Sequence, residues 1–133
     1  MIVDSSALVA IVRREQDADR FITAVGRARH RTMSAASYLE TAIVVDSMRN
    51  PVMTRRFDDL VQASDLSIEP VTAEQADVAR VAYRDFGKGS GHPAQLNFGD
   101  CFAYALATVM REPLLYKGND FGHTGMGSAL RDV

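Results

Sequence analysis

A chain of 133 residues, 47% hydrophobic and 24% charged, is long enough for one folded domain and too apolar for a disordered segment. The formal net charge of -2 argues against a protein that coats nucleic acid through bulk positive charge. No apolar run approaches the roughly 18 residues of a membrane span, and a single cysteine, Cys101, excludes an internal disulfide. We therefore expect one cytoplasmic domain over residues 1–133, with no membrane partner.

The first predicted strand covers residues 1–4 and is followed directly by a helix. The segment MIVD is short, apolar and β-branched, which is typical of a buried strand. Ser5 or Ser6 is expected to cap a helix that runs through residue 14. The spacing of the next apolar residues predicts a second helix with one buried face, formed by Phe21, Ile22, Val25 and Ala28.

Two more short strands are predicted at residues 31–33 and 66–71, with helices between and after them. Ser34 or Ser37 is expected to begin a helix that stops before Asn50–Pro51, because a residue that precedes proline disfavours helical backbone. An amphipathic helix fills the interval before the second of these strands. The helix after it is expected to start at Thr72, to end at Phe86, and to bury Ala76, Ala79, Ala82, Tyr83 and Phe86.

The last part of the chain predicts a loop, a helix and a final strand. Residues 87–97 hold three glycines and a proline and are expected to form the loop. Residues 98–112 form the helix and residues 113–118 the strand. Strands that alternate with helices predict an α/β fold: a parallel sheet of four to five short strands in a three-layer α/β/α domain. Ligands of such sheets collect at the carboxyl ends of the strands.

Four acidic residues stand in unusual sequence surroundings: Asp4, Glu40, Asp100 and Asp120. Asp4 is the only charge in residues 1–12, and Glu40 is the only charge in residues 32–45. Asp100 heads a helical segment of ten uncharged residues, whereas Asp120 directly follows the last strand. Ionised carboxylates are almost never buried without a partner, and no Lys or Arg neighbours the first three in sequence. A shared divalent cation would explain their placement.

Oxygen ligands of this kind suit Mg²⁺ or Mn²⁺ better than zinc. Such a site is suited to phosphodiester hydrolysis, because the metal activates a water and neutralises charge on the phosphoryl oxygens. Simpler explanations exist for each acid: helix capping by Asp4, a distant arginine for Glu40, a capping box of Asp100 with Asn97, and turn formation by Asp120. The coincidence of all four is more specific than any one of them.

The segments MIVDSSALVAI, SAASYLE, GHPAQLNFGDCFAYALA and LLYKGNDFGHT, in this order and spacing, resemble the PIN-domain ribonucleases, specifically the VapC-type toxins of bacterial toxin–antitoxin pairs. The resemblance covers essentially the whole chain, and NFGDCFAYALA is its most specific part. It implies a homodimer that cuts RNA with Mg²⁺ or Mn²⁺. It also implies a cognate antitoxin whose C-terminal segment wraps the toxin and blocks the acidic pocket.

The resemblance also implies roles for individual residues. Asp4 and Asp100 match the direct metal ligands, Glu40 matches a helix-borne acid that helps to hold the metal, and Asp120 matches a fourth acid with a less constant role. Ser5 stands where family members often have threonine. The remaining candidates are Ser6 and Asn119 as supporting residues, and Lys88, His92 and Lys117 as contacts for RNA phosphates.

Other functions fit the sequence less well. A dehalogenase-type phosphatase with Asp4 as nucleophile needs a second acid two residues later, where this chain has Ser6. A receiver-type signalling domain needs an acceptor acid at the end of a mid-chain strand, and the nearest candidate, Asp46, lies on a predicted helix. Cys101 has no histidine or other base fixed nearby in sequence, which disfavours a thiol nucleophile. A catalytically silent PIN fold that binds RNA or a protein partner remains the alternative.

Overall fold

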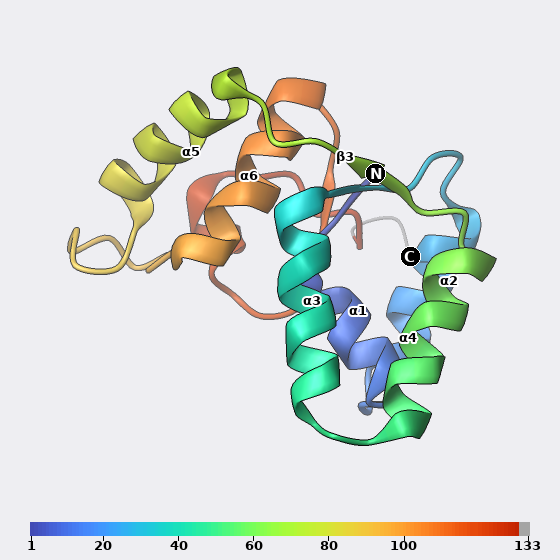
Figure 1. Ribbon diagram of the computed structural model, residues 1–133. Coiled ribbons are helices and arrows are strands. Elements are labelled where there is room, and N and C mark those ends of the chain that lie inside the picture. The colour runs from blue at the N-terminus through green and yellow to red at the C-terminus, as the bar shows by residue number, and fades with distance from the viewer. Residues whose placement is uncertain (131–133) are drawn as a thin grey trace.

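A parallel four-stranded sheet in the order β3-β2-β1-β4 forms the centre of the computed structural model, which describes residues 1–130 (Figure 1). β1 is a central strand: Ile2 pairs with Thr32 of β2 on one side and with Leu114 of β4 on the other. This confirms the predicted α/β fold and fixes the number of strands at four. Their bounds are Ile2–Val3 (β1), Thr32–Ser34 (β2), Ser67–Glu69 (β3) and Leu114–Leu115 (β4).

Helices cover both faces of the sheet. Neighbouring residues of a strand point to opposite faces, so each strand contributes to the packing on both sides. Val3 and Leu115 pack into one hydrophobic cluster with residues from α1 to α4, whereas Ile2 and Leu114 pack into a second cluster with α6 and part of α5. The three layers follow from these two clusters. The helices are Ser5–Val12 (α1), Ala18–Arg27 (α2), Ala35–Ser47 (α3), Pro51–Ala63 (α4), Ala73–Phe86 (α5) and Phe98–Met110 (α6), and a 3₁₀ helix (η1) spans Phe121–Thr124.

The starts of the helices agree with the predicted caps except at α1. Ser34 caps α3 and Thr72 caps α5, as expected. The expectation that Ser5 or Ser6 caps α1 was wrong, because Asp4 occupies the N-cap position and its side chain accepts a hydrogen bond from the Ser6 N–H. A carboxylate is as good a cap as a hydroxyl, so the sequence alone did not separate the two.

Two helices bury narrower faces than the sequence predicted. Phe21 and Val25 of α2 are buried, but Ile22 is 49% exposed because it lies beside a hollow between α2 and α4. On α5, Ala82 is buried, whereas Ala76 and Tyr83 are exposed. α5 packs chiefly against α6, and most residues of α5 outside this contact are exposed.

The described residues offer no helix long and apolar enough to cross a membrane. The expectation of a single domain over residues 1–133 remains a prediction, and its last three residues, 131–133, lie outside the described part of the chain.

Candidate active site

Asp4 lies at the carboxyl end of β1, where the chain turns into α1. Its side chain is 2% exposed, and Oδ2 accepts hydrogen bonds from the Ser6 N–H at 3.0 Å and the Ser6 hydroxyl at 2.6 Å. Loss of hydration on burial raises the pKa of Asp4 to about 6, although both Ser6 bonds lower it. The negative charges of Asp100 and Glu40 raise this pKa further, which places both acids within electrostatic reach.

Ser6 connects the ends of two neighbouring strands. Its hydroxyl donates to Asp4 and accepts a 2.9 Å hydrogen bond from the backbone N–H of Lys117, just after β4. The backbone N–H of Asp4 in turn donates to the Leu115 carbonyl at 2.9 Å. Asp4 is therefore held from both its main chain and its side chain, and the supporting role of Ser6 in the site stays a prediction.

Glu40 enters the same region from α3. Its side chain is half-buried, and Oε1 accepts a hydrogen bond of 2.7 Å from the Ser5 hydroxyl. Its carboxylate lies against Gly99 at the start of α6. The distant arginine considered as a partner for Glu40 is not found among residues 1–130, where Glu40 forms no ion pair.

Asp100 lies in the first turn of α6, next to Gly99. It forms a reciprocal capping box with Asn97: the Asp100 N–H donates to the Asn97 side chain, and the Asn97 N–H donates to Asp100 Oδ2, each at 2.9 Å. Burial raises the pKa of Asp100, the Asn97 N–H lowers it, the Asp120 and Glu40 charges raise it, and the Lys88 charge lowers it. The capping function predicted as an alternative is thus present, and it uses only one carboxylate oxygen.

Asp120 is exposed and precedes η1 without a side-chain capping bond. Its negative charge raises the pKa of Asp100. Asn119 accepts a backbone hydrogen bond from Gly122 through its carbonyl oxygen at 3.1 Å. The supporting role of the Asn119 side chain stays a prediction. The four acids at this end of the sheet, Asp4, Glu40, Asp100 and Asp120, are called the acidic edge below.

The chemistry of the acidic edge fits a hard divalent cation. Asp4, Glu40 and Asp100 each have one oxygen held by a protein donor, and no hydrogen bond within residues 1–130 reaches the other oxygen. The four carboxylates also lack an ion-pair partner in that range. No three acidic, histidine or cysteine side chains of the described residues converge tightly enough to form a ready-made metal site. Like charges without a cation between them repel one another, so a bound cation would offset the repulsion among these carboxylates.

The basic residues predicted near the site differ in what they contact. Lys88 is exposed in the loop after α5, and its charge lowers the pKa of Asp100. His92 uses Nδ1 to accept a hydrogen bond from the Ala94 N–H, and its ring packs edge-on against Phe86. Lys117 is already paired, because its ammonium contacts the two acids Glu15 and Asp17 at 2.5 and 2.8 Å.

The thiol of Cys101 is buried in the core and donates to the Asn97 carbonyl. Burial, followed by the charge of Asp100, raises the pKa of this thiol to about 11. Such a thiol is not ionised near neutral pH and is a poor nucleophile.

Sequence reasoning missed the contacts of Ser5 and Gly99 with Glu40. These residues are far from Glu40 in sequence and meet it only because α1, α3 and α6 pack together. No periodic pattern reports such a contact. A Ser at position 5 and a Gly within a helix were visible, but neither points to a particular partner.

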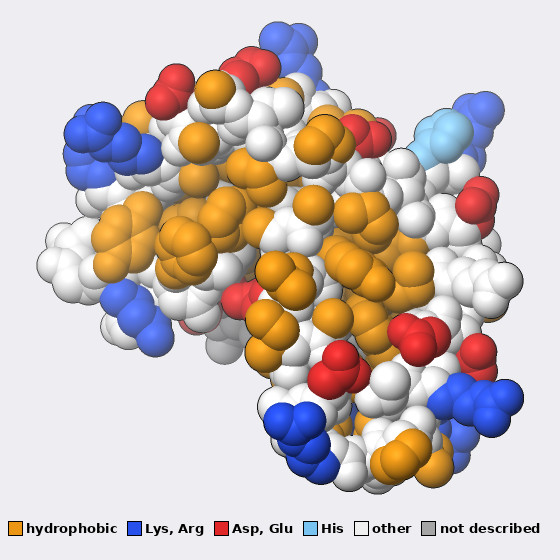
Figure 2. Space-filling model, in the orientation of Figure 1, with side chains coloured by type: hydrophobic (Ala, Val, Ile, Leu, Met, Phe, Trp, Pro, Cys, Tyr) orange, Lys and Arg blue, Asp and Glu red, His pale blue; other side chains and the backbone are white. Residues whose placement is uncertain are grey.

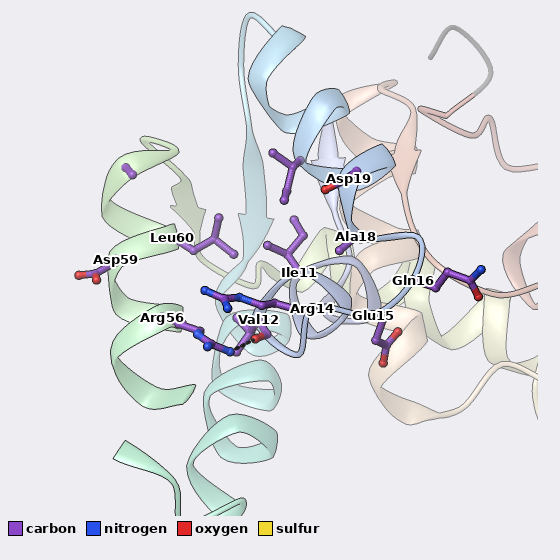
Figure 3. A pocket seen from close by; sticks show the side chains of 12 residues that line it. Ile11, Val12, Arg14, Glu15, Gln16, Ala18, Asp19, Arg56, Asp59 and Leu60 are labelled. Carbon is purple, nitrogen blue, oxygen red and sulfur yellow. Dashed lines mark hydrogen bonds between the residues drawn. The ribbon is translucent and has the colours of Figure 1, made fainter. Parts of the chain in front are cut away.

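A hollow between α1, α2 and α4 lies apart from the acidic edge (Figure 3). It begins at the C-terminal end of α1, whereas Asp4 is at the N-terminal end. Apolar side chains line it beside the guanidinium groups of Arg14 and Arg56 (Figure 3). Its apolar members are Ile11, Val12, Ala18, Ile22, Leu60 and Ala63.

Comparison with known proteins agrees with this arrangement. The family model described as "PIN domain" matches residues 1–126. Ribonuclease VapC28 of Mycobacterium tuberculosis is 59% identical over 130 residues, which cover 98% of each chain. Ribonuclease VapC30 of the same organism is 47% identical over 128 residues, which cover 96% of this chain and 97% of the relative.

Two solved structures share the fold. The crystal structure of VapC20 of Mycobacterium tuberculosis, described as a sarcin–ricin loop cleaving toxin, has a TM-score of 0.72 at 15% identity and covers 94% of this chain and 95% of that one. A toxin–antitoxin complex from Klebsiella pneumoniae has a TM-score of 0.67 at 13% identity, with coverage of 90% and 88%. The chain belongs to the PIN-domain family and, within it, to the VapC ribonucleases.

Proposed function

We propose that this chain is the toxin of a toxin–antitoxin pair and that it cuts RNA internally, by hydrolysing phosphodiester bonds at the acidic edge with Mg²⁺ or Mn²⁺. The observation that carries the proposal is Asp4: a buried carboxylate with no cationic partner in residues 1–130, within electrostatic reach of Glu40 and Asp100. The identity to VapC ribonucleases over nearly the whole chain supports the reaction and the substrate class.

Several residues of the acidic edge would bind the ion together. Asp4 and Asp100 offer the carboxylate oxygens that Ser6 and Asn97 leave free, and Glu40 offers the oxygen that Ser5 leaves free. A bound Mg²⁺ or Mn²⁺ would supply an activated water and charge neutralisation at the phosphate. Asp120 is solvent-exposed and adds negative charge near Asp100. Lys88 and His92 lie in the loop before α6, where their side chains could contact the RNA backbone.

The test is cleavage of single-stranded RNA by purified protein with Mg²⁺ or Mn²⁺, beside an EDTA control and the variant Asp100→Asn. An asparagine at 100 keeps an oxygen for the Asn97 N–H but loses the charge, so the fold is expected to survive while cleavage falls. Asp77→Asn is the matched control, since Asp77 is exposed on α5. Metal-independent cleavage would contradict the mechanism, and binding of RNA without cleavage would support the silent alternative.

We propose a homodimer as the assembled form. Exposed apolar side chains gather over α5, α6 and α3, as Figure 2 shows. Leu39 and Ile43 of α3 are 58% and 59% exposed, and Phe98 of α6 is 77% exposed. A patch of exposed apolar side chains on one face favours the association of two copies of this chain. Sedimentation is expected to give a dimer for the wild type and a monomer for Leu39→Glu/Ile43→Glu, and a monomeric wild type would contradict the proposal.

We propose a cognate antitoxin as the protein partner, acting in the cytoplasm, with a C-terminal segment that covers the acidic edge. The hollow of Figure 3, at the opposite end of α1 from Asp4, offers further apolar contacts for this partner, apart from the acidic edge. The product of a neighbouring reading frame, added in equal amount, is expected to inhibit RNA cleavage. Absence of inhibition by that product would count against the pairing.

A further inference from the structure

The carboxylate of Glu40 is enclosed on two sides. The Ser5 hydroxyl holds Oε1 at 2.7 Å, while the backbone of Gly99 lies against the other oxygen. A Cβ atom added at position 99 would stand 1.9 Å from Oε2 and 2.7 Å from Cδ of Glu40. Separations this short do not occur between a real Cβ and a neighbouring atom. Any side chain at position 99 therefore competes with Glu40 for the same space.

Backbone conformation does not explain the glycine at this position. Gly99 is the second residue of α6 and lacks the positive φ that favours glycine elsewhere in the chain, as at Gly118 or Gly125. Glycine is a poor helix former, so an alanine would suit the helix better if space were the same. Gly26 of α2 provides the comparison, because a Cβ added there meets nothing within 4 Å. What distinguishes Gly99 is the carboxylate beside it.

We propose that Gly99 is a positioning residue for Glu40: its missing side chain lets that carboxylate lie against the first turn of α6, next to Asp100. The positive end of the helix dipole favours a negative charge at this position. Ser5 fixes the second oxygen, so the Glu40 carboxylate is oriented from both sides. The consequence for catalysis rests on the proposed function, whereas the contact itself does not.

A methyl group at position 99 must move either Glu40 or the start of α6. Displacement of Glu40 would also disturb its hydrogen bond with Ser5. Displacement of α6 would move Asp100, which follows Gly99 directly. Both responses change the position of Glu40 relative to Asp100, so Gly99→Ala is expected to weaken divalent-ion binding even though alanine favours the helix.

Metal-free thermal unfolding tests the contact without any assumption about activity. In EDTA, Gly99→Ala is expected to be less favourable for Tm in the wild-type background than in the Glu40→Ala background, because only the wild type has a carboxylate that the methyl group must displace. Gly26→Ala, as the control, is expected to shift Tm by the same amount in both backgrounds. An equal effect of Gly99→Ala in the two backgrounds would overturn the proposal, because the methyl group would then not act through Glu40.

Mn²⁺ binding by calorimetry and RNA cleavage test the consequence. Gly99→Ala is expected to lower Mn²⁺ affinity by about tenfold or more, as removal of a supporting residue commonly does, and Gly26→Ala is expected to leave it unchanged. Gly99→Ala/Glu40→Asp, with one methylene fewer, is expected to recover part of the loss, and unchanged affinity in Gly99→Ala would overturn the positioning role. If the wild type neither binds Mn²⁺ nor cuts RNA, the proposed function fails while the unfolding experiment still decides the contact.

Discussion

The hydroxyl of Ser6 donates a 2.6 Å hydrogen bond to Oδ2 of Asp4, the most buried carboxylate of the acidic edge. The same hydroxyl oxygen accepts from the Lys117 backbone, so a change of the Ser6 side-chain rotamer would leave that N–H unpaired. Only Oδ1 of Asp4 stays free of hydrogen bonds from residues 1–130. Ser6 therefore leaves Oδ1 as the oxygen of Asp4 that is free to bind a ligand.

Ser6→Ala is expected to shift the acid limb of the pH–rate profile to higher pH. The Ser6 bonds lower the pKa of Asp4, so removal of the hydroxyl raises that pKa above its value of about 6 and delays ionisation as the pH increases. Loss of one hydrogen bond to a charged group and of the Lys117 partner is expected to reduce the unfolding free energy by about 1–3 kcal/mol. Cleavage rates across the pH range and urea unfolding check both effects.

Ser47→Ala is the matched control, because the Ser47 hydroxyl is exposed and donates only to the Val44 carbonyl. It is expected to leave the pH–rate profile unchanged. Coincident profiles for Ser6→Ala and the wild type would refute the role assigned to Ser6.

Asp4→Asn is expected to stabilise the metal-free protein in a pH-dependent manner. The pKa of Asp4 rises from 3.8 to about 6 on folding, so the native state binds more protons than the unfolded state between these values. Stability therefore falls as the pH rises through this window, and the cost is complete above it, at roughly 3 kcal/mol. Asparagine removes the charge and still offers an oxygen to Ser6.

The measurement is urea unfolding of wild type and Asp4→Asn in EDTA at about pH 4 and about pH 8. The gain in unfolding free energy is expected at the higher pH and is expected to vanish at the lower one. Mg²⁺ is expected to stabilise the wild type and not the variant. A large loss of stability at both pH values would instead identify Asp4 as a structural residue.

Much of this site could be predicted because buried segments are recognisable in the sequence as runs of apolar or uncharged residues. The apolar run around Asp4 and the uncharged segment after Asp100 each predicted a carboxylate in a buried setting, and both are raised in pKa by burial. The alternation of strands and helices predicted the parallel sheet. The end of β1 then placed Asp4 where parallel sheets bind ligands.

What the sequence could not predict depends on how separate helices meet. Ile22 matches an apolar helical face, yet it borders a hollow because α4 does not cover it. Glu40, Ser5 and Gly99 come from three helices, and their contact depends on close packing that no local period encodes. Asp4 as the cap of α1 was one of two acceptable arrangements, and the hydrogen bond to Ser6 decides between them.

Cys101→Ala is expected to retain RNA cleavage and Mn²⁺ binding. With a pKa of about 11, the buried thiol is ionised in roughly one molecule in ten thousand at neutral pH. A thiol reagent is accordingly expected to react slowly with the folded protein and rapidly after unfolding in urea, which serves as the positive control. Loss of cleavage in Cys101→Ala with an unchanged Tm would show that the thiol participates after all.

Lys88 and Lys117, the two lysines of the chain, are expected to contribute unequally to RNA affinity. Lys117 is already neutralised by Glu15 and Asp17, whereas Lys88 forms no ion pair within residues 1–130. In the Asp100→Asn background, fluorescence anisotropy with single-stranded RNA at several salt concentrations compares them. Lys88→Ala is expected to reduce the slope of log affinity against log salt by about 0.7, the value for one phosphate contact. Lys117→Ala is expected to leave the slope nearly unchanged, and the reverse order would show that RNA displaces Glu15 and Asp17 from Lys117.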